Sequence, residues 1–231
     1  MTIAIAALAL VVPASAAAEA PRQTFTATFT TPEPGASAGL TLEIDYVNPA
    51  DPEAKPPAVA EVVIQAPQGA AVDTSVPPRC DVPDPLVMLL GAGACPEGSV
   101  VGRGDLVLDT GLILSENDIT LINATDKLIF VTRPKGVPIP GGLVTPTSVE
   151  NGTFRTAVPP IPGLPPPDIF TALDHVRLEL DERTTAAGSY ITTPPGCPAE
   201  GAWTTVATFT YRDGVTQSAA ATSPCQPAAL P

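Results

Sequence analysis

The chain has few basic residues, a single histidine and few aromatic side chains, and these shortages argue against several classes of function. It carries 11 Lys and Arg against 24 Asp and Glu, a net charge of −13 over 231 residues. Nucleic acids and anionic lipids are bound through positive charge, so neither is expected as a partner. Aromatic residues make up only 4% of the chain, which argues against a sugar-binding platform of stacked rings. Tyr190 is the one aromatic residue that we expect to be exposed.

The apolar run at residues 3–12 is too short to span a bilayer, which takes about 20 apolar residues. Pro13 ends the run, and Ala14-Ser15-Ala16 then has the small-x-small pattern of a signal peptidase site. No Lys or Arg precedes it. We interpret residues 1–18 as a signal peptide with a truncated n-region. The mature chain is expected to be secreted, extracellular or in the cell envelope, without a membrane span.

Helical patterns are scarce, and 30 prolines oppose them. The only helix candidate, residues 86–90, follows Asp84-Pro85 and stops at Gly91. Alternation of apolar and polar residues predicts strands instead. They are expected at 25–29, 40–46, 59–65, 105–110, 127–132, 176–181, 203–211 and 215–222, with hairpin turns at Asn151-Gly152 and Asp213-Gly214.

Strands with one polar face pack as antiparallel layers. The predicted fold is therefore an all-β antiparallel β-sandwich with long Pro-rich loops and at most one short helix. We expect a single domain over residues 19–231, with a Pro-rich insertion around residues 134–167.

Four cysteines, Cys80, Cys95, Cys197 and Cys225, permit three disulfide pairings in an exported chain. A structural zinc site is disfavoured because the chain has no Cys-x-x-Cys and its only histidine is distant in sequence. We expect the local pairing. Cys80–Cys95 would close the loop that holds the short helix, and Cys197–Cys225 would tie the entry of the Asp213-Gly214 hairpin to its exit.

Gly35-Ala36-Ser37-Ala38-Gly39 matches the Gly-x-Ser-x-Gly nucleophile elbow letter for letter. That motif works between a buried strand and a helix, whereas here prolines precede it and a strand follows. The only available base, His175, lies on the polar face of its predicted strand. We therefore expect no Ser37/His175 hydrolase. A proton shuttle between His175 and Asp174 is not expected either, because strand neighbours point to opposite faces.

Acidic residues gather at two places that invite a metal interpretation. They are Glu116, Asn117 and Asp118, and the nearby pair Asp51 and Glu53. Neither place has the spacing of an EF-hand loop, and isolated carboxylates on loops are ordinarily solvated. No metal ligand and no cofactor is expected, although a calcium ion bound by loops stays open as an alternative.

Three short motifs have simpler explanations than function. Asn123-Ala124-Thr125 and Asn151-Gly152-Thr153 fit glycosylation acceptors, but we expect neither asparagine to carry a glycan in an exported bacterial protein. Arg103-Gly104-Asp105 spells an integrin-recognition tripeptide but runs straight into a predicted strand, where no exposed loop tip can form.

Two blocks carry a resemblance to known proteins. They are Cys80…Cys95-Pro96-x-x-Ser99-x-Val101-Gly102 and Cys197-Pro198-x-x-Gly201-x-Trp203…Phe209-x-Tyr211-x-Asp213-Gly214…Pro224-Cys225. Over roughly Val59 to Cys225 the chain resembles uncharacterised exported actinobacterial proteins with immunoglobulin-like β-sandwich modules. The resemblance implies an immunoglobulin-like fold, export and disulfides, and it implies no activity.

The sequence favours an exported, disulfide-stapled, non-catalytic interaction or structural module. Its partner would be an unknown protein or a component of the cell envelope. One alternative is a secreted hydrolase with carboxylates on its loops, such as Asp168, Asp174 or Glu150. Another is a calcium- or glycan-binding module. No catalytic or cofactor-binding residue is assigned.

Overall fold

The computed structural model of the chain describes residues 19–163 and 170–226. The predicted signal peptide and Asp168 therefore lie outside the described residues. Strands dominate the described part, and its one α-helix, α1 (Asp84–Leu90), is short. The all-β class and the short helix are confirmed. Among these residues no helix has the length and apolar character needed to cross a membrane.

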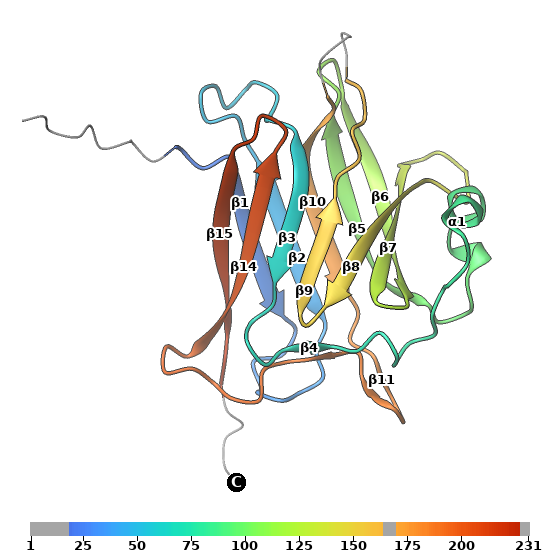
Figure 1. Cartoon of the computed structure of the whole chain (residues 1–231), viewed down its shortest axis with the longest axis vertical. Helices are drawn as coiled ribbons and strands as arrows, with labels where there is room; N and C mark the ends of the chain where they lie inside the picture. The colour runs from blue at the N-terminus through green and yellow to red at the C-terminus, as the bar shows by residue number, and fades with distance from the viewer. Residues whose placement is uncertain (1–18, 164–169, 227–231) are drawn as a thin grey trace, which may run out of the picture.

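Eleven strands form one sheet in which every neighbouring pair is antiparallel (Figure 1). In order across the sheet they are β1 (Gln23–Phe29), β2 (Leu40–Tyr46), β10 (Ala172–Leu180), β5 (Val100–Asp109), β6 (Leu114–Ala124), β7 (Lys127–Pro134), β8 (Leu143–Glu150), β9 (Thr153–Ala157), β3 (Val59–Gln65), β14 (Ala202–Tyr211) and β15 (Thr216–Pro224). Two small sheets pair β4 (Ala71–Val72) with β13 (Ile191–Thr192) and β11 (Thr184–Thr185) with β12 (Gly188–Ser189). They lie at the lower end in Figure 1.

The large sheet is barrel-like, because its first and last strands meet. With an odd number of alternating strands, β1 and β15 run in the same direction, and side chains join them. The Phe29 N–H donates to Ser223 Oγ at 3.0 Å, and the Arg22 N–H donates to Gln217 Oε1 at 3.0 Å. The sheet therefore differs from the two separate sheets of an immunoglobulin sandwich. Alternation of apolar and polar residues predicts which face of a strand is buried. It does not predict whether further strands join the two layers into one sheet.

Two glycines help the sheet to bend. Gly102 and Gly104 lie on β5 against β10, and a Cβ on either would come within 2.2 Å of a carbonyl oxygen of that strand. Only glycine permits this approach, and glycine within a strand marks a tight bend of this kind.

Strand alternation is clean in β1 and β2, and β2 and β3 have the predicted bounds. The sequence missed β6 and the first half of β5. In β6 the polar run around Asn117 is followed by Leu121 and Ile122, which are both fully buried. Two adjacent buried residues break the period of two, because this strand is covered on both faces. The predicted Pro-rich insertion also contributes β8 and β9 to the main sheet.

The second face of β6 and β7 is covered by residues 73–99, which include α1 and the 3₁₀ helix η1 (Gly91–Ala94). Val87 of α1 packs there with Ile122, Ile129 and Val131 beside Cys80. We call this cluster the outer pad. In Figure 1 the helix lies outside the sheet, next to β7.

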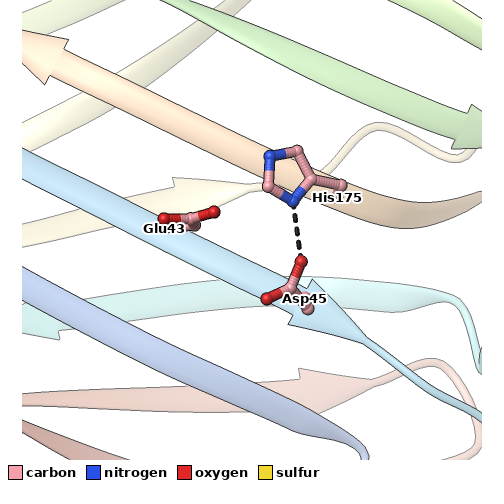
Figure 2. Close-up of side chains that lie close together, drawn as sticks. All are labelled: Glu43, Asp45 and His175. Carbon is pink, nitrogen blue, oxygen red and sulfur yellow. Dashed lines mark hydrogen bonds and ion pairs between the residues drawn. The ribbon is translucent and has the colours of Figure 1, made fainter.

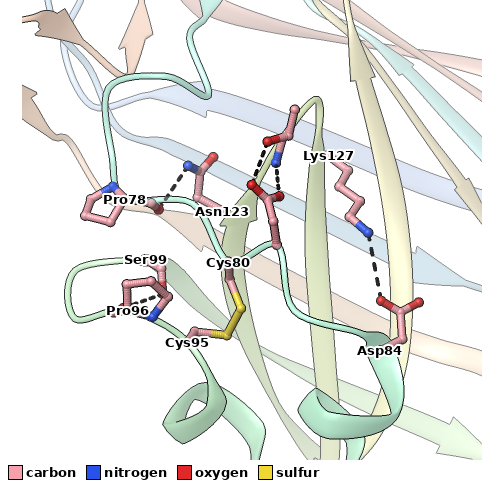
Figure 3. Close-up of a disulfide and its surroundings, with 10 residues drawn as sticks. Pro78, Cys80, Asp84, Cys95, Pro96, Ser99, Asn123 and Lys127 are labelled. Atoms are coloured by element: carbon pink, nitrogen blue, oxygen red, sulfur yellow. Dashed lines mark hydrogen bonds and ion pairs between the residues drawn. A yellow bond between two sulfur atoms is a disulfide. The ribbon is translucent and has the colours of Figure 1, made fainter.

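Polar contacts anchor the segment over the outer pad (Figure 3). Asn123 Nδ2 donates to the carbonyls of Thr74, Pro77 and Pro78 at 2.9, 3.1 and 3.2 Å. Asp81 accepts from the backbone N–H and the hydroxyl of Thr125 at 3.0 and 2.8 Å. Asn123 is fully buried, so the side chain of this glycosylation motif is occupied in the fold.

Both local disulfides are present, Cys80–Cys95 and Cys197–Cys225. Loop-closure entropy gives about 3 kcal/mol for the first and roughly 3.5 kcal/mol for the second. Each disulfide contacts a different apolar cluster, because Cys80 belongs to the outer pad and Cys225 to the core inside the sheet.

The expectation that Tyr190 is exposed is wrong. It is fully buried and belongs to the core cluster inside the sheet.

Candidate functional site

The described residues leave part of the interior of the barrel-like sheet unfilled. A cavity of about 130 Å³ lies between the inward faces of β2, β3 and β5 through β10. Most of its wall is aliphatic or aromatic, with residues such as Leu42, Ile44, Val62, Leu106 and Phe154. An engineered apolar cavity of about 150 Å³ stays dry and binds benzene. The space inside this sheet therefore suits an apolar body of similar size.

The burial of inward residues changes along the strands, which locates the more accessible end. On β10, Leu178 and Leu180 near the lower end are buried, whereas the inward Leu173 at the upper end is only half-buried. On β5, Leu106 is buried and Leu108 is half-buried. Among the described residues the cavity is therefore more accessible at the upper end, where the β5–β6 connection lies (Figure 1).

The polar groups of the wall are neutral. Among the described residues that line the cavity none is charged, and the polar ones are Tyr46, Thr132, Thr145, Thr147, Thr156 and Thr171. The Thr147 and Thr156 hydroxyls share a hydrogen bond of 2.7 Å. The Tyr46 hydroxyl is buried and has no hydrogen-bond partner among the described residues. Burial raises the pKa of Tyr46 far above its usual value, with a further contribution from nearby Tyr211.

A second arrangement lies on the outer face of the sheet. Glu43 and Asp45 on β2 meet His175 on β10, and one ligand atom from each lies within 4.8 Å of the others. Figure 2 shows the His175 ring lying between the two strands with Asp45 bonded to it. His175 Nδ1 is 2.7 Å from Asp45 Oδ1, and its Nε2 is 3.7 Å from Asp105 Oδ2 on β5.

These residue types can bind zinc, but Arg177 already pairs with one of the carboxylates. Arg177 Nη1 lies 3.6 Å from Glu43, and its Nη2 lies 2.7 Å from Glu179. The Glu179 hydrogen bond and charge come first among the causes that raise the pKa of Arg177. Charges of opposite sign thus face each other across β2, β10 and β5. This is the pattern of cross-strand ion pairs on a solvated face, and the cavity is the stronger candidate site.

The structure does not bring Ser37 and His175 together. Ser37 Oγ shares a 2.9 Å hydrogen bond with Thr184 of β11 at the lower end, whereas His175 is bonded to Asp45 near the upper end. His175 lies on the polar outer face, as predicted. The reason given for separating it from Asp174 needs correction, because the register of β10 against β5 shifts between Leu173 and His175. Strict alternation does not hold at Asp174.

The other candidate carboxylates also lie apart. Asp174 is near the start of β10 at the upper end, and Glu150 ends β8 at the lower end. Partial burial is the first cause that raises the pKa of Asp174, and the negative charge of Asp109 is the second. Neither Asp174 nor Glu150 lines the cavity.

The two predicted acidic clusters have local roles. Glu116 to Asp118 lie within β6, where Asn117 is buried and its Nδ2 donates to Ser115 O at 2.7 Å. Glu116 faces Lys135 at 3.4 Å. Asp51 Oδ1 accepts from the Glu53 N–H at 3.2 Å, which is a local turn contact.

Sequence reasoning missed the cavity, the Tyr46 hydroxyl and the meeting of β2 with β10 that gathers Glu43, Asp45 and His175. Alternation did place Tyr46 inside and the other three outside. Comparison with known proteins gives no match: no family model, no curated protein and no solved structure matches the chain.

Proposed function

We propose that this chain is an exported, non-catalytic binding protein of the cell envelope or extracellular space that holds a small, uncharged apolar molecule inside its barrel-like sheet. The observation that carries the proposal is the cavity of about 130 Å³ with its mainly apolar wall. Ligand sites are typically concave and mostly apolar, with a few polar groups that fix orientation.

The wall also argues for a neutral ligand. No described lining residue is charged, and an unpaired charge is costly to bury. The net charge of −13 adds a repulsion for anions at the accessible end. A fatty-acid carboxylate would find no cation among the described wall residues.

Two further observations support the remaining parts of the proposal. Paired disulfides are typical of oxidising compartments, which fits export together with the predicted signal peptide. The described cavity wall holds no Asp, Glu, His, Cys or Ser. A binding role is therefore favoured over acid–base or nucleophilic chemistry inside the cavity.

The test is an NMR titration with isopropylbenzene, using two variants that differ only in the face of β3 that is changed. Val62 lines the cavity, whereas the next residue, Val63, points outward. Val62→Phe fills the space, and we expect it to weaken binding by at least about tenfold, or 1.4 kcal/mol. Val63→Phe should leave the dissociation constant unchanged within about twofold. Thermal unfolding of both variants reports whether they fold.

Surface binding is the competing explanation that this pair excludes. Leu89 on α1 is 67% exposed and Leu112 before β6 is 69% exposed, so an apolar probe has other places to adhere. Binding that survives Val62→Phe in a folded variant, or no binding to the wild-type chain at all, would contradict the proposed function. Phe130→Trp, which adds bulk from β7, serves as the second filling variant if Val62→Phe does not fold.

A further inference from the structure

The Tyr46 hydroxyl is a buried donor for which the described part of the chain supplies no acceptor. Tyr46 is 5% exposed and lines the cavity. Its hydroxyl has no hydrogen-bond partner among the described residues. Buried polar groups in folded proteins are nearly always paired, and each exception calls for an explanation. A ligand in the cavity is an explanation that accounts for both the empty space and the unpaired group.

The position of Tyr46 is fixed by its strand and its neighbours. It ends β2, where alternation turns it inward together with Leu42 and Ile44. Its ring packs edge-on against Phe209, with centroids 6.0 Å apart and planes at 87°. The ring is held by this packing, so the hydroxyl is a preorganised donor that loses little freedom on binding.

Three of the five threonine hydroxyls of the described wall are paired. Thr147 and Thr156 satisfy each other, and the Thr171 hydroxyl donates to Pro162 O at 3.2 Å. Burial holds the pKa of Tyr46 well above the physiological range, so the phenol stays protonated and can donate. Tyr46 is therefore the lining residue of the described wall whose polar group is fully buried and has no hydrogen-bond partner.

We propose that Tyr46 determines specificity by donating a hydrogen bond to an uncharged oxygen acceptor, such as a ketone or ester carbonyl, on the apolar molecule in the cavity. The inference rests on the proposed function and deepens it. The ligand class becomes a neutral, mainly apolar molecule with a carbonyl-type oxygen, rather than a pure hydrocarbon or an acid.

A matched control exists within the chain. Tyr190 is also fully buried, and its hydroxyl also lacks a partner among the described residues. Tyr190 does not line the cavity and lies with the short strands at the lower end. Tyr190→Phe therefore removes the same kind of group without touching the proposed site.

The experiment compares two probes of equal heavy-atom count, isopropylbenzene and acetophenone, in which one methyl group is exchanged for a carbonyl oxygen. Dissociation constants are measured by NMR titration for the wild-type chain, Tyr46→Phe and Tyr190→Phe. We expect Tyr46→Phe to weaken acetophenone binding by about five- to tenfold, the usual loss for one hydrogen bond. Isopropylbenzene should bind Tyr46→Phe as it binds the wild type, and Tyr190→Phe should change neither probe.

The stability of the free protein gives an independent readout. Removing an unpaired buried hydroxyl should leave the melting temperature unchanged or raise it, so a fall would indicate that Tyr46 serves the fold. If both probes bind the wild type and Tyr46→Phe weakens neither, or weakens both equally, the inference about Tyr46 is wrong and the cavity function stands. If neither probe binds the wild type, the proposed function fails and the inference fails with it.

Discussion

The outer pad and the interior of the sheet are built on the same strands, yet they are packed differently. Successive residues of β7 point to opposite sides, with Leu128 facing the interior and Ile129 facing the pad, and both are buried. On the pad side, Val87 from α1 and the Cys80–Cys95 disulfide fill the space. On the interior side a cavity of about 130 Å³ remains.

The comparison indicates that the outer pad contributes to stability and the interior contributes to binding. The pad is filled by side chains of the chain itself, and three hydrogen bonds from Asn123 hold its covering segment in place. A well-packed cover of this kind stiffens the wall behind a binding site. Changes in the pad should therefore affect stability without affecting binding, whereas changes in the upper interior should affect binding first.

The largest effect is expected for Asn123→Asp. This change replaces a buried amide that donates to three carbonyls with a carboxyl group that cannot reproduce those bonds. We expect a loss of about 4 kcal/mol in the free energy of unfolding, measured by urea denaturation. Where the variant is folded, its affinity for isopropylbenzene should equal that of the wild type. A loss below about 1 kcal/mol would show that the anchor is unimportant.

The next prediction compares substitutions at two neighbouring residues of β7. Ile129→Ala removes a fully buried side chain from the pad, and we expect it to cost about 3 kcal/mol. Phe130 is half-buried and lines the cavity, so Phe130→Ala should cost about 1.5 kcal/mol. Phe130→Ala should also enlarge the cavity and shift its preference from isopropylbenzene toward n-butylbenzene. Urea denaturation measures the loss in free energy of unfolding, and NMR titration measures the ligand preference. A larger loss for Phe130→Ala than for Ile129→Ala would contradict the contrast between the two faces.

The smallest effect concerns pH. Hydrogen bonds from the backbone N–H and then the hydroxyl of Thr125 hold the pKa of Asp81 below its usual range. Its contribution to stability is therefore complete above about pH 4 and is lost as the pH falls through the lower pKa of the folded state. Asp81→Asn should reduce the fall in melting temperature on acidification below about pH 4. Hydrogen exchange should locate the change in residues 80–95, and an identical acid profile for both proteins would contradict the assignment.

The sequence was informative wherever one side of a strand meets water. In β2 the alternation placed Leu42 and Tyr46 inside and Glu43 outside, and the structure agrees. It failed in β6, where both Leu121 and Ile122 are buried, because burial on two sides removes the period of two. Tyr190 was misjudged because a small neighbouring Gly and Ser suggested a loop, whereas tertiary contacts cover it.

The candidate site depends on properties that alternation does not encode. An inward pattern identifies a core, but the volume left inside depends on how far the sheet curves. That curvature arises from long-range pairing, such as β10 between β2 and β5, and from Gly102 and Gly104. The unpaired Tyr46 hydroxyl is likewise visible only when its surroundings are known. The local disulfides, by contrast, follow from cysteine positions near the ends of one loop and one hairpin.

The most direct test of the central claim is where isopropylbenzene contacts the protein. Intermolecular nuclear Overhauser effects should connect the ligand to methyl groups of the interior, such as those of Leu42, Val62 and Leu178, which line the cavity. No such effects should reach Val87 or Ile129 of the filled pad. Contacts confined to the exposed leucines of α1, or no contact with any interior methyl group at saturating ligand, would contradict the account.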